Sequence, residues 1–594
     1  MGDHGNLDHM RTPNYDKHPF VAVPGAESAC VAGWEEVGQR LREVLTGIAR
    51  VKTILAVECY PGVDELAVAQ RLTDLLRPSL VIRAADAFKP EDDINRLCEP
   101  YLGGDDPVFG YLCPLELARF FAPRMLNLLG RSVARAKKGV ILVVGTGATL
   151  VCEPDVLVYA DLSRWEIQQR QRRKEIPNLG INNANQAAGV KYKRAYFIDW
   201  RVADRWKKPL LQRADFFLDT HQTASPKLAD GGAVRRGWVT AARRPFRVVP
   251  FFDPGVWGGQ WLKDVCDLDR SAVNYAWGFD CVPEENSLLL GFGGHRFELP
   301  SIDLVFDQPR SLLGEAVHAR FGDGFPIRFD FLDTMGGGNL SFQVHPLTEY
   351  IQEKFGMHYT QDESYYMLDA GPEAAVYLGV KEGVDQAAML RDLRLAQAGG
   401  APFPDGSYVN RWPAKKHDHF LIPAGTVHCS GAGAMVLEIS ATPYIFTFKL
   451  WDWSRLGLDG NPRPIHLDHG AANIAWDRDT EWTRQHLVNR IEALGGGDGW
   501  REERTGLHGR EFIETRRHWF TKSVEHDTCG GVNVLNLVEG EEVIVESPDG
   551  TFDPVIIHYA ETFIVPAAVG RYAIRPHGPG CGQECATMKA YVRT

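Results

Sequence analysis

The sequence has no long hydrophobic run and no excess of positive charge. Within its 594 residues no apolar stretch reaches the roughly 18–20 residues needed to span a membrane, and the opening MGDHGNLDHMRTP contains no apolar signal segment. The formal net charge of −12 argues against nucleic acid or an anionic membrane as the main partner. We therefore expect a cytoplasmic protein with no membrane or nucleic-acid partner, in which any phosphate ester is bound by local cations.

Cysteines are scarce and lack the spacing of a metal site. The 11 cysteines are scattered without a C-x-x-C pair, and Cys581 and Cys585 are the only close couple. Such a distribution is typical of reduced, mostly buried thiols. We expect no second metal site at this pair.

The N-terminal third alternates short apolar strands with helical stretches. Residues 1–33 are polar, with Pro and Gly, and predict an irregular arm. Strands are then predicted at 53–57, 79–84, 139–145 and 155–161, and helices at 34–49, 64–77 and 115–137. Short apolar strands separated by helices predict a doubly wound, mainly parallel α/β sheet over 34–220.

The loop after the first predicted strand lacks a phosphate-binding motif. It reads E58-C-Y-P-G-V-D-E65, without the glycine spacing, Lys and Ser/Thr that cradle phosphates and magnesium. The layout of 34–220 nevertheless resembles a nucleoside-kinase-like P-loop fold, so we expect a degenerate, non-phosphorylating domain. The remaining candidates for a kinase site are Asp86 and the basic helix with Arg164, Arg170, Arg172, Arg173 and Lys174. We favour the alternative that these are a capping aspartate and a solvated helix face.

Short predicted strands with Gly and Pro turns dominate after a connecting segment at 221–237. They predict all-β sandwiches or barrels, with helical insertions at 384–398 and 478–494. A weak internal repeat relates F420-L-I-P-A-G-T-V-H428 to F563-I-V-P-A-A-V-G-R571. We therefore predict a central unit at 238–500 and a related C-terminal unit at 501–594, in which Arg571 replaces His428.

Four residues of the central unit form a metal-ligand pattern. Gln343 and His345 lie two apart on a predicted strand, so their side chains face the same side. Glu363 begins another apolar run, and His428 follows a Pro-Ala-Gly turn. Two imidazoles, one carboxylate and one amide oxygen suit a divalent ion such as zinc with an open position. A lone strand histidine is more often a hydrogen-bonded core residue, but the joint pattern favours a metal site.

Several separate motifs between 248 and 468 share their order and spacing with one enzyme family. They are V-W-G-G at 256–259, F-L-D at 331–333, L-S-F-Q-V-H-P at 340–346, Y-L-G-V-K-E-G-V at 377–384, F-L-I-P-A-G-T-V-H at 420–428, V-L-E-I at 436–439 and W-D-W-S-R-L-G-L-D-G-N-P-R-P-I-H-L at 451–467. This region resembles the type I phosphomannose isomerases, zinc-dependent cupins that interconvert mannose 6-phosphate and fructose 6-phosphate. The resemblance implies a catalytic cupin at 238–500 and a second cupin-like jelly roll, without a metal site, at 501–594.

The resemblance also implies roles for individual residues. Gln343, His345, Glu363 and His428 fall on the family's ligands for one zinc ion, and Arg455 falls on its active-site arginine. Because a guanidinium stays protonated, Arg455 suits an electrostatic role. Glu438 is our first candidate for the catalytic base, and a carboxylate that orients a ligand imidazole is an equal alternative. Trp257 matches a position at the sugar cleft, where a core tryptophan is the alternative.

The chain departs from the family at two cationic positions. Asp330 and Gln361 stand where the family usually has lysines, which puts mannose 6-phosphate itself in question. Arg328, Ser341 and Lys381 are candidates for a phosphate site of altered shape. Alternatively, Asp330 binds hydroxyl groups of an unphosphorylated sugar, since carboxylates accept from polyols and repel phosphates.

Taken together, the motifs predict a zinc-dependent aldose–ketose isomerase that acts on mannose 6-phosphate, or a related sugar or sugar phosphate, through an enediol. One alternative is a non-catalytic sugar-sensing regulator, because the lysines and the phosphate loop are lost. Others are an isomerase or epimerase of a free sugar, and a working kinase fused to an isomerase. A homo-oligomer remains an open alternative for the assembly.

Overall fold

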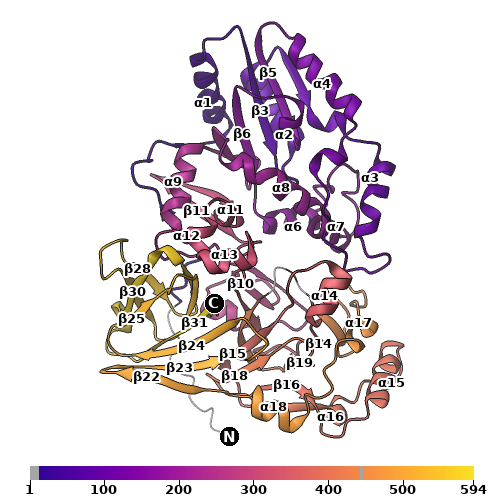
Figure 1. The fold of residues 1–594 in the computed structure, drawn as a ribbon, viewed down its shortest axis with the longest axis vertical. Coiled ribbons are helices and arrows are strands. Elements are labelled where there is room, and N and C mark those ends of the chain that lie inside the picture. Colours follow the sequence, from indigo (N-terminus) through magenta and orange to yellow (C-terminus); the bar gives the residue numbers. More distant parts are fainter. Residues whose placement is uncertain (1–12, 442–443, 445, 507) are drawn as a thin grey trace.

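An α/β domain lies at one end of the long axis, and two β-sandwiches lie at the other end (Figure 1). This computed structural model describes residues 13–441, 444, 446–506 and 508–594. A small sheet, β1-β11-β12, and its helices lie between the α/β domain and the sandwiches (Figure 1). Within the described residues, every helix is too short or too polar to cross a membrane.

The α/β domain is built on a seven-stranded sheet with the order β2-β8-β7-β6-β3-β5-β4. Its five parallel strands are β3 (Lys52–Cys59), β4 (Leu80–Arg83), β5 (Gly139–Gly145), β6 (Val156–Asp161) and β7 (Phe216–Asp219). β3 lies at the centre, and the chain adds β4 and β5 on one side before β6 and β7 on the other. The central strands are nearly continuous apolar runs because helices cover both faces. The predicted, mainly parallel α/β sheet is confirmed.

Two of the three predicted helices, at 34–49 and 64–77, are confirmed as α1 and α2 among the helices of this domain. The helices are α1 (Trp34–Gly47), α2 (Glu65–Leu76), α3 (Glu91–Cys98), α4 (Pro123–Arg135), α5 (Ala148–Val151), α6 (Arg164–Arg172), α7 (Ala188–Arg194) and α8 (Trp200–Leu211). α2 begins where Asp64 accepts a hydrogen bond from the Ala67 amide, a standard N-cap. The long helix predicted at 115–137 is instead a 3₁₀ turn (Leu117–Phe120) followed by α4, which Pro123 starts.

Two segments predicted to be irregular contain regular elements. β1 (Phe20–Ala22) pairs with β11 (Ser287–Phe292), and β2 (Cys30–Ala32) pairs with β8 (Lys227–Asp230). α9 (Gly231–Ala241) follows β8. The predictions of an irregular arm up to residue 33 and of a linker at 221–237 are therefore wrong, while residues 1–12 lie outside the described chain. Strands of three or four residues are too short to show an alternating pattern, and distant partners create them.

The loop after β3 is occupied by its own acidic side chains. Glu58 accepts hydrogen bonds from the Gly147 and Thr149 amides, at 2.5 and 2.8 Å, and Glu65 accepts one from Thr146. Burial raises the pKa of Glu58 to about 7. The two carboxyl groups thus bind the turn between β5 and α5 and tie it to the loop after β3.

The basic helix α6 is an ion-paired element. Arg164 is buried and lies 2.5 Å from Asp204, and buried Arg170 pairs with Glu166 at 3.0 Å. The interpretation of these two residues as a solvated helix face is therefore wrong. Asp86 forms a surface ion pair with Arg83 instead of capping a helix. Burial of the two arginines depends on tertiary partners, which the charge pattern of one helix does not show.

The central unit is a sandwich of two antiparallel sheets, as predicted. The first contains β9 (Phe251–Asp253), β10 (Trp277–Cys281), β13 (Arg328–Asp333), β15 (Glu363–Ala370), β18 (His419–Ile422) and β20 (Ala434–Ser440). The second contains β14 (Phe342–Val344), β16 (Ala375–Val380), β17 (Val409–Pro413), β19 (His428–Ser430) and β21 (Phe448–Trp451). Helix α15 (Gln386–Gln397) confirms the insertion predicted at 384–398.

The C-terminal unit is a second antiparallel sandwich. Its larger sheet contains β22 (Glu492–Gly497), β23 (Trp500–Gly506), β24 (Ile513–Phe520), β26 (Asn533–Glu539), β29 (Thr562–Val565) and β31 (Cys585–Val592). The smaller sheet contains β25 (Val524–Asp527), β27 (Glu542–Glu546), β28 (Val555–His558) and β30 (Arg571–Pro576). The unit therefore begins before residue 501, and the helix predicted at 478–494 is limited to α18 (Thr480–His486).

The internal repeat has a structural counterpart. In the first copy β18 belongs to one sheet and β19 to the other, and in the second copy β29 and β30 are divided in the same way. Each copy is thus a turn that carries the chain from one sheet of its sandwich to the other. In the second copy Arg571 is exposed and pairs with Glu525.

A continuous buried apolar cluster joins the α/β domain to the central sandwich. The interior of the C-terminal sandwich forms a separate cluster that includes Phe520, Leu535, Val543 and Phe563. Because buried side chains of both parts belong to this one cluster, the α/β domain packs firmly against the central unit. The α/β domain therefore forms part of the surroundings of the interior of the central sandwich.

A buried cation reinforces this docking. Lys207 of α8 lies 2.6 Å from Asp161 of β6 and 2.5 Å from Asp303 of α11 (Ile302–Asp307). We expect Lys207→Met to lower the free energy of unfolding by about 3–5 kcal/mol, because it leaves two buried carboxylates without a cation. Burial already raises the pKa of Asp303 well above its usual range. Protonation at acidic pH therefore offsets part of the loss, and the defect should grow as the pH rises.

Urea denaturation followed by circular dichroism measures this effect. Lys208→Met is the matched control, because its partly exposed pair with Asp323 should contribute below about 1 kcal/mol. Equal denaturation midpoints for the two variants would contradict a structural role for the buried triad.

Candidate metal centre

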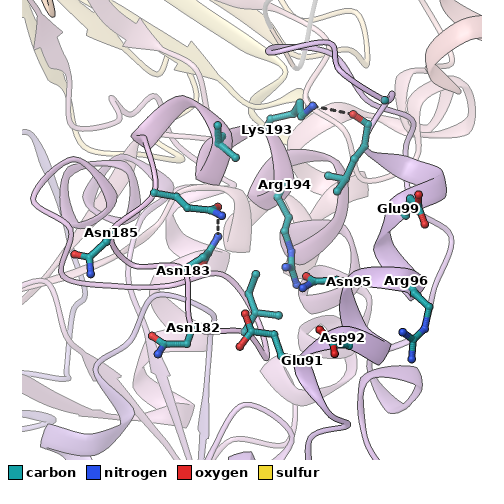
Figure 2. Close-up of a pocket in the computed structure, with 15 residues that line it drawn as sticks. Glu91, Asp92, Asn95, Arg96, Glu99, Asn182, Asn183, Asn185, Lys193 and Arg194 are labelled. Carbon is teal, nitrogen blue, oxygen red and sulfur yellow. Dashed lines mark hydrogen bonds between the residues drawn. The ribbon is translucent and has the colours of Figure 1, made fainter.

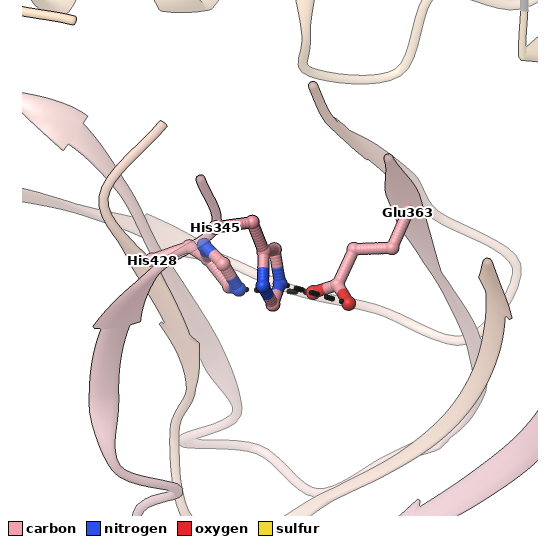
Figure 3. Close-up of side chains that lie close together, drawn as sticks. All are labelled: His345, Glu363 and His428. Carbon is pink, nitrogen blue, oxygen red and sulfur yellow. Dashed lines mark ion pairs between the residues drawn. The ribbon is translucent and has the colours of Figure 1, made fainter. Parts of the chain in front are cut away.

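Two histidines and a glutamate meet between the two sheets of the central sandwich. Figure 3 shows His345 and His428 facing Glu363 across a short gap. His345 Nε2 lies 3.0 Å from one carboxylate oxygen of Glu363, and His428 Nε2 lies 2.9 Å from the other. All three side chains are buried. Potential ligand atoms of the three residues lie within 4.8 Å of one another.

The strand register places these residues. β14 pairs with β19 so that Gln343 is opposite His428, and His345 follows β14 on the same face. Glu363 begins β15, which belongs to the other sheet. The carboxylate therefore reaches the two imidazoles from across the sandwich.

Gln343, also a predicted ligand, lies beside this group. Its amide nitrogen lies 3.2 Å from His428 Nε2. Rotating the amide by 180° exchanges nitrogen and oxygen and presents the oxygen to the same point. Gln343 is therefore brought together with the other three predicted ligands.

Backbone carbonyls orient both imidazoles. His345 Nδ1 donates to the Phe446 carbonyl at 2.7 Å, and His428 Nδ1 donates to the Thr426 carbonyl at 2.8 Å. The Nε2 lone pairs consequently point at Glu363, which is the arrangement of metal-binding histidines.

The donor set fits a divalent metal ion. Within the described part of the chain, His345 Nε2 and Glu363 Oε1 are buried and make no hydrogen bond. Two imidazole nitrogens, a carboxylate and an amide oxygen suit zinc or a similar ion. Gln361 donates to Glu363 Oε2 at 2.8 Å, and so fixes the carboxylate from behind. We infer that these residues are arranged to hold one ion.

A cavity of ≈ 310 Å³ extends from Gln343 toward the α/β domain. Its apolar walls include Trp257, Trp277, Phe279, Leu332 and Leu340, and its polar residues include Arg328, Asp330, Ser341, Gln343, Gln361, Glu438, Lys449 and Arg463. Trp257, Arg328, Ser341 and Glu438, which the sequence nominated, therefore all reach this space. Trp257 is also buried, so it belongs to both the core and the cavity wall.

Two carboxyl groups share one side of the cavity. Asp330 of β13 and Glu438 of β20 are opposite each other in the strand register. Burial raises the pKa of Asp330 to about 6. Burial and repulsion from Asp330 and Glu363 raise the pKa of Glu438 well above its usual range. Arg328 donates to Asp330 at 3.1 Å and compensates its charge. Of the two paired carboxyl groups, Arg328 thus binds Asp330 and not Glu438.

Cations that the sequence analysis missed lie on the other side. Lys449 of β21 is opposite Gln343 in the register, and burial lowers its pKa to about 8. Arg463 donates to Ser341 at 3.1 Å and to Asp452 at 2.7 Å. Arg463 stands inside the motif at 451–467, and Lys449 lies two residues before it, so these positions were visible in the sequence without being recognised.

Two nominated residues are not brought into the cavity. Arg455 is held by Asp452 at 2.6 Å and by the Asn339 carbonyl at 2.6 Å, and the cavity lining within the described residues does not include it. Lys381 follows β16 on the exposed surface and donates to the Gly406 carbonyl. The structure therefore does not support the expectation that Lys381 contacts substrate, and Arg455 reaches the site only through Asp452.

The α/β domain matches a family model described as a domain of unknown function, DUF8485, over residues 33–243. These limits coincide with the domain from α1 to α9. The central unit is similar to the mannose-6-phosphate isomerase ManA of Bacillus subtilis (strain 168), with 26% identity over 224 residues, 38% of this chain and 65% of the relative. The chain spans 62–66% of the length of the curated relatives it matches.

Solved structures give a similar result. The mannose 6-phosphate isomerase of Bacillus subtilis has a TM-score of 0.47 and 18% identity, covering 59% of this chain and 100% of that chain. A zinc-bound mannose 6-phosphate isomerase has a TM-score of 0.45 and 14% identity, with the same coverage. The sequence similarity to mannose-6-phosphate isomerases covers 36–38% of this chain.

Metal binding can be tested directly. We expect purified protein to contain about one equivalent of a divalent metal by elemental analysis, and His345→Ala to lose most of it, because one of the two imidazoles is removed. His417→Ala is the control, since His417 lies outside the group and contacts Tyr366 and Glu539. Equal metal contents in the wild type and His345→Ala would contradict the assignment.

Proposed function

We propose that this protein is a metal-dependent aldose–ketose isomerase of a sugar phosphate. The observation that carries the proposal is the buried His345–Glu363–His428 group next to a cavity that also holds the Glu438 carboxyl group and several cations. A divalent ion held there would act as a Lewis acid toward the carbonyl and hydroxyl oxygens of an open-chain sugar. The class of relatives over the central unit supports the same chemistry.

Glu438 is placed to move the proton. In the aldose-to-ketose direction the base removes hydrogen from C2, the electron pair forms the C1–C2 double bond, and O1 gains a proton. The resulting enediol loses the O2 proton, the C2 carbonyl forms, and the base returns its proton to C1. No atom is gained or lost, so one carboxyl group in reach of both carbons suffices. Asp330 is less suited because Arg328 holds it as an ion pair.

The cations favour a phosphorylated substrate. Lys449, Arg463 and the hydroxyl of Ser341 lie on the cavity side opposite the carboxyl groups, and Asp452 binds Arg463 and Arg455 behind them. Two guanidinium groups share this single carboxylate, and Lys449 adds an ammonium to the cavity, so positive charge remains for an anion. These groups replace the lysines absent at 330 and 361. Mannose 6-phosphate and fructose 6-phosphate are therefore the first substrate pair we propose.

The cavity volume favours a single sugar unit. Ligand pockets range over about 300–1,000 Å³, and ≈ 310 Å³ lies at the small end of this range. Asp330 supports a second candidate, an isomerase of an unphosphorylated sugar, because its carboxylate lies in the cavity and accepts hydrogen bonds from hydroxyl groups. The relative turnover of mannose 6-phosphate and mannose decides between the two.

The role of Glu438 gives a direct test. We expect zinc-loaded protein to convert mannose 6-phosphate to fructose 6-phosphate, and Glu438→Gln to lower kcat by about 10²–10⁴-fold, because the amide cannot take the proton. Metal content should stay unchanged. Glu382→Gln, an exposed residue beyond β16, is the control.

If Glu438→Gln keeps its kcat, the carboxylate only orients its neighbours and another group is the base. If the wild type converts neither the phosphorylated nor the free sugar when loaded with metal, the proposed reaction is wrong.

A further inference from the structure

The α/β domain supplies part of the cavity wall. Pro107 and Val108, from the segment before α4, and Gly189 and Tyr192, from α7, line the same space as Gln343 and Glu438. All four residues lie before residue 248, where the motifs described in the sequence analysis begin. Residues far from the metal ligands in the sequence thus face the place proposed for the sugar.

The segment 106–109 is fixed by several hydrogen bonds. The Asp106 carboxylate accepts the amides of Val108 and Phe109, both at 2.7 Å. The Lys193 ammonium donates to the carbonyls of Leu102 and Asp106. Tyr444 of the central unit donates to the Val108 carbonyl at 3.2 Å. A segment held from both domains forms a preorganised wall.

Tyr192 is held from both sides as well. Its hydroxyl donates to Glu285 at 2.9 Å, and its ring stacks on Tyr444 with centroids 5.9 Å apart. The side chain is only partly buried, and it lines the cavity. An aromatic ring with a fixed hydroxyl is a rigid surface for one face of a sugar.

The contact between the α/β domain and the central unit also supports the orientation of His345. The Phe109 ring stacks on Phe446, with centroids 5.5 Å apart and ring planes 16° from parallel. The Phe446 carbonyl accepts the hydrogen bond that orients His345. Docking of the α/β domain therefore supports both the wall and the ligand geometry.

The opposite face of α7 lines a different hollow. Val190, Lys193 and Arg194 border a surface hollow of ≈ 870 Å³, shown in Figure 2 with Lys193 and Arg194 above the α3 side chains. α7 is thus a thin partition, with Gly189 and Tyr192 on the cavity side and Val190 on the other. This geometry provides matched variants within one helix turn.

We propose that the α/β domain is a built-in part of the substrate site, in which Tyr192 and the 107–108 segment limit the ligand to a single sugar phosphate. This inference rests on the proposed function. Gly189 and Tyr192 also line an adjoining hollow of ≈ 230 Å³, so the wall lies between two spaces and holds the sugar in the one next to the metal ligands. The domain acts by shape and contact, without nucleotide chemistry of its own.

Binding of mannose 6-phosphate, measured by titration calorimetry on the full chain, tests the wall separately from turnover. We expect Tyr192→Ala to raise Kd and KM about tenfold with a smaller change in kcat, because it removes ring contact made before the proton moves. Tyr192→Phe keeps the ring and should stay within about twofold of the wild type. Val190→Ala, on the far face of α7, should behave like the wild type.

Gly189→Leu covers the case in which Tyr192→Ala does not fold. A Cβ at Gly189 meets no atom within 4 Å, and leucine is a better helix former than glycine, so the fold should tolerate it. The added side chain should fill the cavity and weaken Kd by about tenfold or more without loss of metal.

Unchanged Kd values for both Tyr192→Ala and Gly189→Leu overturn the inference, as does an equal loss in Val190→Ala. If the wild type binds but does not turn over the sugar, and the variants still weaken binding, the proposed reaction fails while the wall stands. If the wild type turns over the sugar and the variants bind equally well, the wall fails while the reaction stands.

Discussion

The buried carboxylate of Glu363 is the interaction on which the central unit depends. A charged group in a dry interior is costly unless opposite charge and hydrogen bonds compensate it. His345 and His428 approach it from the opposing sheet, and Gln361, two residues before it in the chain, donates a hydrogen bond. The arrangement therefore joins the two sheets at one point and presents nitrogen and oxygen donors to a divalent ion. Without an ion, the same arrangement leaves polar atoms buried with unused bonding capacity.

The α/β domain and the isomerase-like unit are linked through a small aromatic contact. Phe109 packs on Phe446, whose carbonyl orients His345, and Tyr192 packs on Tyr444. The α/β domain, which supplies Val108 and Tyr192 to the cavity wall, thus has a structural use in this protein. The domain lines the cavity and, through Phe446, supports the orientation of His345. The α/β domain and the central sandwich thus form the site together.

The sequence predicted local features well and tertiary ones poorly. Alternation along one strand places Gln343 and His345 on the same face, and the repeat correctly marks a turn between two sheets. Motif matching selected Arg455, but the register across β14 and β21 brings Lys449 beside Gln343 instead. No local pattern could indicate Tyr192 or Val108, because their role arises only from domain docking. Short strands such as β1 and β8 were missed because their partners are distant in the chain.

Anomalous diffraction from crystals of the full chain, recorded at the zinc absorption edge, tests the central claim most directly. The account predicts one strong peak between His345 Nε2, His428 Nε2 and the Glu363 carboxylate, with the Gln343 oxygen turned toward it. Crystals soaked in zinc that show no peak there, while the two imidazoles remain bonded to Glu363, would contradict the account.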